Sequence, residues 1–157
     1  MKTVLKISVS LLMTLVITNI SAQEHFDLKI GEMRNNQAIL VIDFDSTMSS
    51  LEAIVEANSS LFVRFDKLSI EEGTDESTDY YYMLAEDTNN HIKTVKELVL
   101  DNGTFYEIMA PGGGSATLTC SGCSIGCDPK KMGPTWVCYP NCTGSKCNKT
   151  ITITIDD

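Results

Sequence analysis

The cysteines of this 157-residue chain are confined to its last quarter. Residues 1–119 contain none, and the short segment that follows contains six, at Cys120, Cys123, Cys127, Cys138, Cys142 and Cys147. An exported protein uses such a set for disulfides, whereas a cytosolic protein more often uses it for metal or for catalysis. The beginning of the chain therefore decides how the end is interpreted.

Residues 1–22 have the pattern of a secretory signal peptide. Lys2 and Lys6 form a positive leader, residues 7–17 form an apolar core, and Ala22 is a small residue at the expected cleavage point. The core is shorter than the ~20 residues that a spanning helix needs, so no membrane span is expected after cleavage. We expect a secreted, periplasmic or extracellular protein.

The chain is acidic, with a formal net charge of −9. Removal of the leader takes away two lysines and no acidic residue, which leaves a net charge of −11. Nucleic acid and anionic membrane surfaces carry charge of the same sign and are not expected as partners. We divide the remainder into an acidic β-rich body (23–110), a glycine-rich joint (111–115) and a cysteine-rich module that ends in a strand (116–157).

The body has the alternation and turn signals of short strands with one helix. The helix is expected at 48–57, with Ser49 and Glu52 at capping-box spacing. The run 38–42 is continuously apolar and predicts a strand buried on both faces, while the acidic stretch 71–79 predicts a loop. Further strands are expected at 25–30, 60–70, 80–84 and 104–109, with 93–100 as either a strand or a helical turn.

Residues 149–155 alternate isoleucine with threonine and predict a strand. Its isoleucines are expected to face a core and its threonines to face water. Because a free edge of this composition invites aggregation, we expect the strand to return to the sheet as an edge or closing strand. The predicted fold class is α+β and β-rich: a small antiparallel sheet, one short helix and a C-terminal loop module held by disulfides.

Six cysteines in an exported chain favour three disulfides and no cofactor, with fifteen pairings open. The segment between them is rich in glycine and proline and poor in apolar residues, so crosslinks must supply its order. The alternative is zinc or another metal, because four of the cysteines have the spacing C-x2-C-x14-C-x3-C, close to that of a zinc ribbon. That site would consist of Cys120, Cys123, Cys138 and Cys142.

The segment 39–47 ends an apolar run with Asp43-Phe44-Asp45-Ser46-Thr47. It resembles the first motif of haloacid-dehalogenase-type phosphohydrolases. The resemblance implies a second alternative, in which Asp43 is a nucleophile, Asp45 is an acid/base and both help to bind Mg²⁺. Fewer than 70 residues separate Asp43 from the glycine-rich joint, which is too few for the doubly wound sheet of that family.

The aromatic and basic residues of the cysteine-rich module are the main binding candidates, since rigid aromatics on a crosslinked loop make good anchors. The competing interpretation is that the single tryptophan covers a disulfide in place of a core. We expect a secreted or surface-associated, non-enzymatic protein that binds a protein or glycan ligand through this module. The candidate binding residues are Trp136, Tyr139, Lys130 and Lys131.

Overall fold

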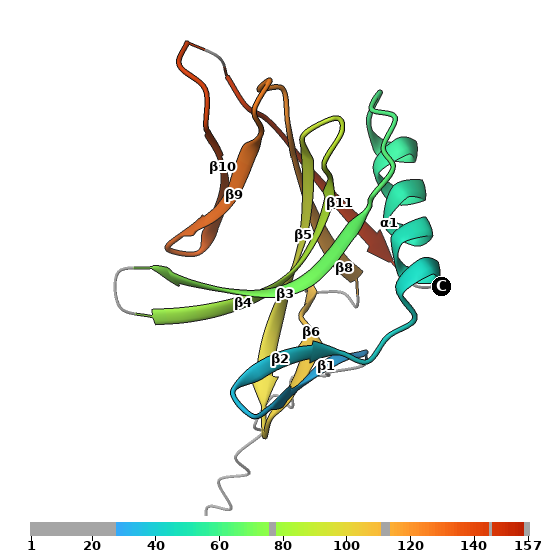
Figure 1. The fold of residues 1–157 in the computed structure, drawn as a ribbon, viewed down its shortest axis with the longest axis vertical. Coiled ribbons are helices and arrows are strands. Elements are labelled where there is room, and N and C mark those ends of the chain that lie inside the picture. The colour runs from blue at the N-terminus through green and yellow to red at the C-terminus, as the bar shows by residue number, and fades with distance from the viewer. Residues whose placement is uncertain (1–27, 76–77, 111–113, 145, 156–157) are drawn as a thin grey trace, which may run out of the picture.

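The computed structural model describes residues 28–75, 78–110, 114–144 and 146–155 (Figure 1). The predicted signal peptide lies outside these ranges. No helix within the described ranges is long and apolar enough to cross a membrane. The elements are β1 (Lys29–Arg34), β2 (Gln37–Leu40), α1 (Phe44–Asn58), β3 (Lys67–Asp75), β4 (Thr78–Asp87), β5 (Ile92–Asp101), β6 (Thr104–Glu107), β7 (Met109–Ala110), β8 (Gly114–Ser121), β9 (Cys127–Met132), β10 (Thr135–Pro140) and β11 (Asn148–Ile155).

Nine of the strands form one sheet, and every strand pair in the described residues is antiparallel. Its main order is β11-β8-β5-β6-β1-β2, with β4 and β3 added to one half of β5 and β7 beside β8. Strands β9 and β10 form a separate hairpin. The β-rich antiparallel fold with one helix is confirmed. The expectation of a small sheet is wrong, because the sheet is large, strongly curved and nearly closed (Figure 1).

Local turn chemistry explains two of the hairpins. Asn102 and Gly103 have φ angles of 48° and 80° and join β5 to β6, while Asn35 and Asn36 have φ angles of 52° and 60° and join β1 to β2. Asparagine and glycine tolerate this left-handed conformation better than other residues do. The residue types at these two turns therefore match the backbone conformation that the turns require.

Several local expectations are wrong. Strand β2 is an exposed edge strand, because it ends the sheet order and pairs only with β1 among the described strands. The helix begins at Phe44, because Asp43 is its N-cap and accepts a hydrogen bond from the Ser46 amide at 2.8 Å; the Ser49 capping box is not used. The acidic stretch 71–79 belongs largely to the paired arms of β3 and β4 rather than to a loop.

The central sheet has two covered faces. On one, helix α1 contributes Leu51 and Val55 to a core whose other fully buried members include Phe105; we call this the helix-side core. On the other, the β9–β10 hairpin covers Val95 and Leu118 together with buried cysteines; we call this the cystine-side core. Figure 1 shows the helix and the hairpin on opposite sides of β5 and β8.

Strand β11 is an edge strand, as expected, but its faces are inverted. Ile151, Ile153 and Ile155 are 57%, 60% and 70% exposed, whereas Thr152 is buried. The cause is register: Ile151 lies opposite Leu118, and opposed residues of an antiparallel pair point to the same face. Since Leu118 points into the cystine-side core, the isoleucines point to the same face of the sheet. They remain exposed because the hairpin does not extend far enough to cover them.

Candidate functional site

Three disulfides organise the end of the chain. Cys120 pairs with Cys138, Cys123 with Cys142 and Cys127 with Cys147, at Cα–Cα distances of 5.5, 6.2 and 5.9 Å. The first three cysteines therefore bond to the last three in the same order. The expectation of three disulfides is confirmed.

The zinc alternative needs four free thiolates at Cys120, Cys123, Cys138 and Cys142. In the structure these sulfurs are consumed in two disulfides and are not available as ligands. No cluster of three or more His, Cys, Asp or Glu side chains in the described part of the chain is placed to hold a metal ion. The oxidised pairing and the zinc site are mutually exclusive uses of the same sulfurs.

Polar contacts fasten the hairpin to the sheet at two places. At one, Glu97 of β5 accepts a hydrogen bond from the Trp136 indole at 3.0 Å and pairs with the Lys131 ammonium. At the other, Lys93 of β5 pairs with Asp128 at 2.7 Å. Partial burial opposes ionisation of Asp128, but the hydrogen bonds from Lys93 and Asn141 outweigh it and lower the pKa of this carboxyl. The Asp128 carboxylate is thus held in its charged form by Lys93 and Asn141.

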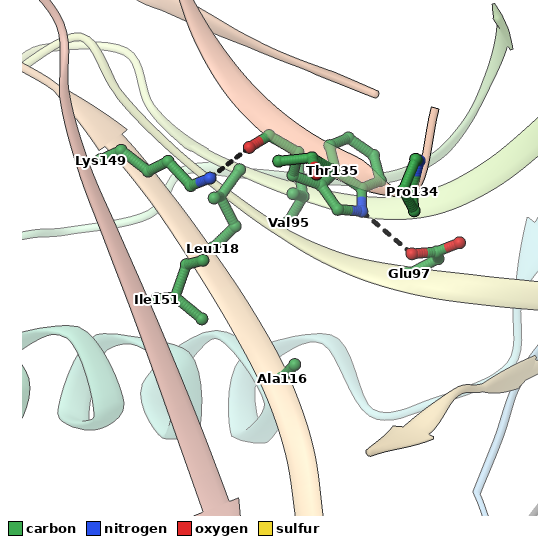
Figure 2. Close-up of a pocket in the computed structure, with 9 residues that line it drawn as sticks. Val95, Glu97, Ala116, Leu118, Pro134, Thr135, Lys149 and Ile151 are labelled. Carbon is green, nitrogen blue, oxygen red and sulfur yellow. Dashed lines mark hydrogen bonds between the residues drawn. The ribbon is translucent and has the colours of Figure 1, made fainter. Parts of the chain in front are cut away.

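A groove opens between the hairpin and the sheet (Figure 2). It has a volume of about 320 Å³. Aliphatic side chains from three neighbouring strands form its floor, and the start of β10 forms its wall. We call it the Trp136 groove. Its lining consists of Val95, Glu97, Ala116, Leu118, Pro134, Thr135, Trp136, Lys149 and Ile151.

Trp136 is held firmly at this groove. Its ring meets Tyr80 and Tyr82 edge-on, with centroid distances of 5.4 and 5.3 Å. Its carbonyl accepts a hydrogen bond from the Lys149 ammonium across the groove (Figure 2). Burial, more than the neighbouring charges, raises the pKa of Tyr82, so its hydroxyl stays protonated at neutral pH. The tryptophan is therefore a fixed wall and not a mobile side chain.

The four predicted binding residues lie on two faces of the hairpin. Trp136 and Lys131 lie opposite each other in the register and both reach Glu97, so they point toward the sheet. Lys130 lies opposite Val137 on the other face, and the exposed Tyr139 has the same parity. The four do not form one surface. The floor residues of the groove were missed, because nothing in the local sequence joins β5 and β8 to the hairpin.

The acidic motif has a structural position at the start of α1. Asp43 accepts a hydrogen bond from the Ser46 amide, and this bond lowers the pKa of its carboxyl. Asp45 lies exposed in the first helical turn. The strand before them, β2, is an antiparallel edge strand, and the described strands do not form the parallel doubly wound sheet that the phosphohydrolase resemblance implies. The motif here serves to begin a helix.

Comparison of this chain with protein-family models, with curated proteins and with solved structures gave no match.

Proposed function

We propose that this is an exported, non-enzymatic binding protein that holds an extended apolar segment of a protein partner in the Trp136 groove. The observation that carries the proposal is the apolar surface where the hairpin meets the sheet. The groove continues onto Ile153 and Ile155, which are exposed beside its floor residue Ile151. Contiguous exposed apolar surface of this kind is typical of interaction sites.

The lining favours a protein segment over a glycan. The floor is formed by aliphatic side chains, and Trp136 and the two tyrosines are engaged with one another. An aliphatic or aromatic side chain gains free energy by leaving water there, whereas sugar hydroxyls would lose hydrogen bonds to water. The exposed isoleucines recur at every second residue of β11, which matches the side-chain spacing of an extended partner strand.

The disulfides support both export and rigidity. Three crosslinks are typical of proteins in oxidising compartments. They hold the groove wall in one place before the partner arrives, so less conformational entropy is lost on binding.

The fluorescence of Trp136 provides a direct test, because it is the only tryptophan in the chain. We would titrate the protein with a blocked five-residue peptide that has threonine at every second position and leucine at the central position. The expected result is a saturable change in emission, which an otherwise identical peptide with a central asparagine does not produce. Binding weaker than about 5 mM, or equal binding of the two peptides, would contradict the proposal.

A variant that fills the groove gives the matching control. Ala116 is exposed on the groove floor, so Ala116→Phe should occupy the groove without disturbing the core and weaken binding of the leucine peptide about tenfold or more. Ala38→Phe makes the same change at an exposed alanine of edge strand β2, outside the groove lining, and should bind as the parent does. Equal affinities of the two variants would place the binding site elsewhere.

A further inference from the structure

A charged pair lies inside the molecule on the helix side of the sheet. The Lys96 ammonium is 2.8 Å from a carboxylate oxygen of Glu107, and their side chains are only 12% and 5% exposed. The same oxygen accepts a hydrogen bond from the Ser115 hydroxyl. This cluster and the Trp136 groove lie on opposite faces of the sheet. Lys96 and the groove residue Glu97 are adjacent on β5, and adjacent residues of a strand point to opposite faces.

The pair does not gain stability simply by being buried. Desolvation of two charges offsets most of their attraction, so an apolar pair of similar size would usually serve a core at least as well. The surroundings are apolar, since Met83 lies directly opposite Lys96 in the register and Ile30 and Leu51 are close by. An ion pair in such a place therefore points to a role other than packing.

The pair borders a cavity of about 210 Å³. Its apolar side is formed by Leu28, Ile30, Ile42, Leu51 and Met83, and its polar side by Lys96 and Glu107. Ser46, Thr47 and Ser50 from the first two turns of α1 line the cavity as well, with the Ser46 and Thr47 hydroxyls donating to the Asp43 carbonyl. A mostly apolar cavity with a few convergent polar groups is the usual form of a small-molecule site.

The chemistry of the polar side selects the kind of ligand. An ammonium has three N–H donors and a carboxylate has several acceptor positions, and the pair bond uses only one of each. An amide group matches both partners, because its carbonyl accepts from Lys96 while its N–H donates to Glu107. A carboxylate would face the negative charge of Glu107, and an amine would face the positive charge of Lys96.

We propose that this cavity binds a small neutral amide with a short aliphatic chain, the amide bridging Lys96 and Glu107 and the chain lying against Met83 and Leu51. This inference goes beyond the proposed function and does not depend on it, since the two sites lie on opposite faces of the sheet.

Three probes of equal length and different charge test the proposal: pentanamide, pentanoate and pentylammonium. Binding is followed by NMR from the methyl signal of Met83, which lines the cavity, and the exposed Met132 on the hairpin reports nonspecific effects. Pentanamide should shift the Met83 signal saturably and leave Met132 unchanged, and each charged probe should bind about fivefold more weakly or worse. Absence of a Met83 shift at about 50 mM pentanamide would overturn the proposal.

The variant Glu107→Gln removes the negative charge and leaves Lys96 without its counterion. It should strengthen pentanoate binding about tenfold, so that pentanoate, which binds more weakly than pentanamide in the parent, binds more tightly than pentanamide in the variant. Glu72→Gln makes the same change at an exposed position of β3 and should keep the parental order. An unchanged order in folded Glu107→Gln would also overturn the proposal. If that variant does not fold, the order of the three probes in the parent protein decides.

Discussion

The two faces of the central sheet are covered in different ways. The helix-side core is a packed apolar cluster in which Ile30, Val63 and Phe105 are fully buried. The cystine-side core has only Val95 and Leu118 as buried aliphatic residues, and buried cysteines complete it. One face is held by removal of apolar surface from water and the other by covalent crosslinks. The difference shows how a single sheet can support a segment that is too poor in apolar residues to fold by burial alone.

The polar groups follow the same division. On the cystine side, two charged pairs join the hairpin to the sheet and remain partly exposed. They are the pair of Glu97 with Lys131 and the pair of Asp128 with Lys93. On the helix side, the pair of Lys96 and Glu107 is enclosed and borders a cavity. The partly exposed pairs join the hairpin to the sheet, whereas the Lys96–Glu107 pair borders the cavity that we propose as a ligand site.

The largest expected effect comes from breaking the helix-side core. Phe105 is completely buried and its ring meets Tyr81 at 5.2 Å, so Phe105→Ala should lower the free energy of unfolding by about 3–5 kcal/mol. Urea denaturation followed by circular dichroism measures this change. Phe62→Ala is the matched control, because Phe62 is 65% exposed and should cost well under ~1 kcal/mol. Equal losses in the two variants would show that this core is not held by burial.

Removal of one crosslink should be the next largest effect. The bond between Cys127 and Cys147 closes a loop with a sequence separation of 20, for which chain entropy predicts a loss of about 3 kcal/mol on breaking. The double variant Cys127→Ala, Cys147→Ala avoids free thiols. Because the two faces of the sheet are held in different ways, hydrogen exchange in this variant should accelerate most in β9 and β10 and least in α1. Equal acceleration in α1 would mean that helix α1 and the β9–β10 hairpin do not unfold independently of each other.

The smallest expected effect is the pH dependence of the contact between Lys93 and Asp128, which joins the hairpin to the sheet. The folded pKa of Asp128 lies below its ordinary value of 3.8, because the hydrogen bonds from Lys93 and Asn141 outweigh the effect of burial. Its contribution is therefore present above pH 3.8 and is lost as pH falls below that value toward the folded pKa. The side chain is 47% exposed, so we expect only a few tenths of a kcal/mol. Unfolding free energies between pH 5 and about pH 2 should fall more steeply for the parent than for Asp128→Asn, and parallel curves would contradict the assignment.

Features with a local physical cause were predictable. The turn at Asn102 and Gly103 follows from their tolerance of positive φ, and the strand that became β11 follows from its alternating β-branched residues. The helix was placed four residues late at its start, because Asp43 rather than Ser49 caps it. Several residues can cap a helix equally well in sequence, and only the path of the chain before it selects one.

The candidate site was predictable only in part. Trp136 was identified as a rigid residue on a crosslinked loop, and it does form the groove wall. Its partners Val95, Glu97 and Leu118 lie far away in the chain, and no sequence pattern joins them to it. The cavity beside Lys96 and Glu107 was not anticipated at all, because the pair is created by the pairing of β5 with β6 and the placement of α1.

The sequence by itself indicated that the chain is β-rich and that residues 149–155 form a strand, and it favoured three disulfides over zinc ligation for the six cysteines, because these depend on residue types and short spacings. Only the tertiary structure decided which cysteines pair, which face of β11 is buried and where the cavities lie. The isoleucines show the reason. Alternation specifies that two faces exist, but the register against Leu118 decides which of them meets a core.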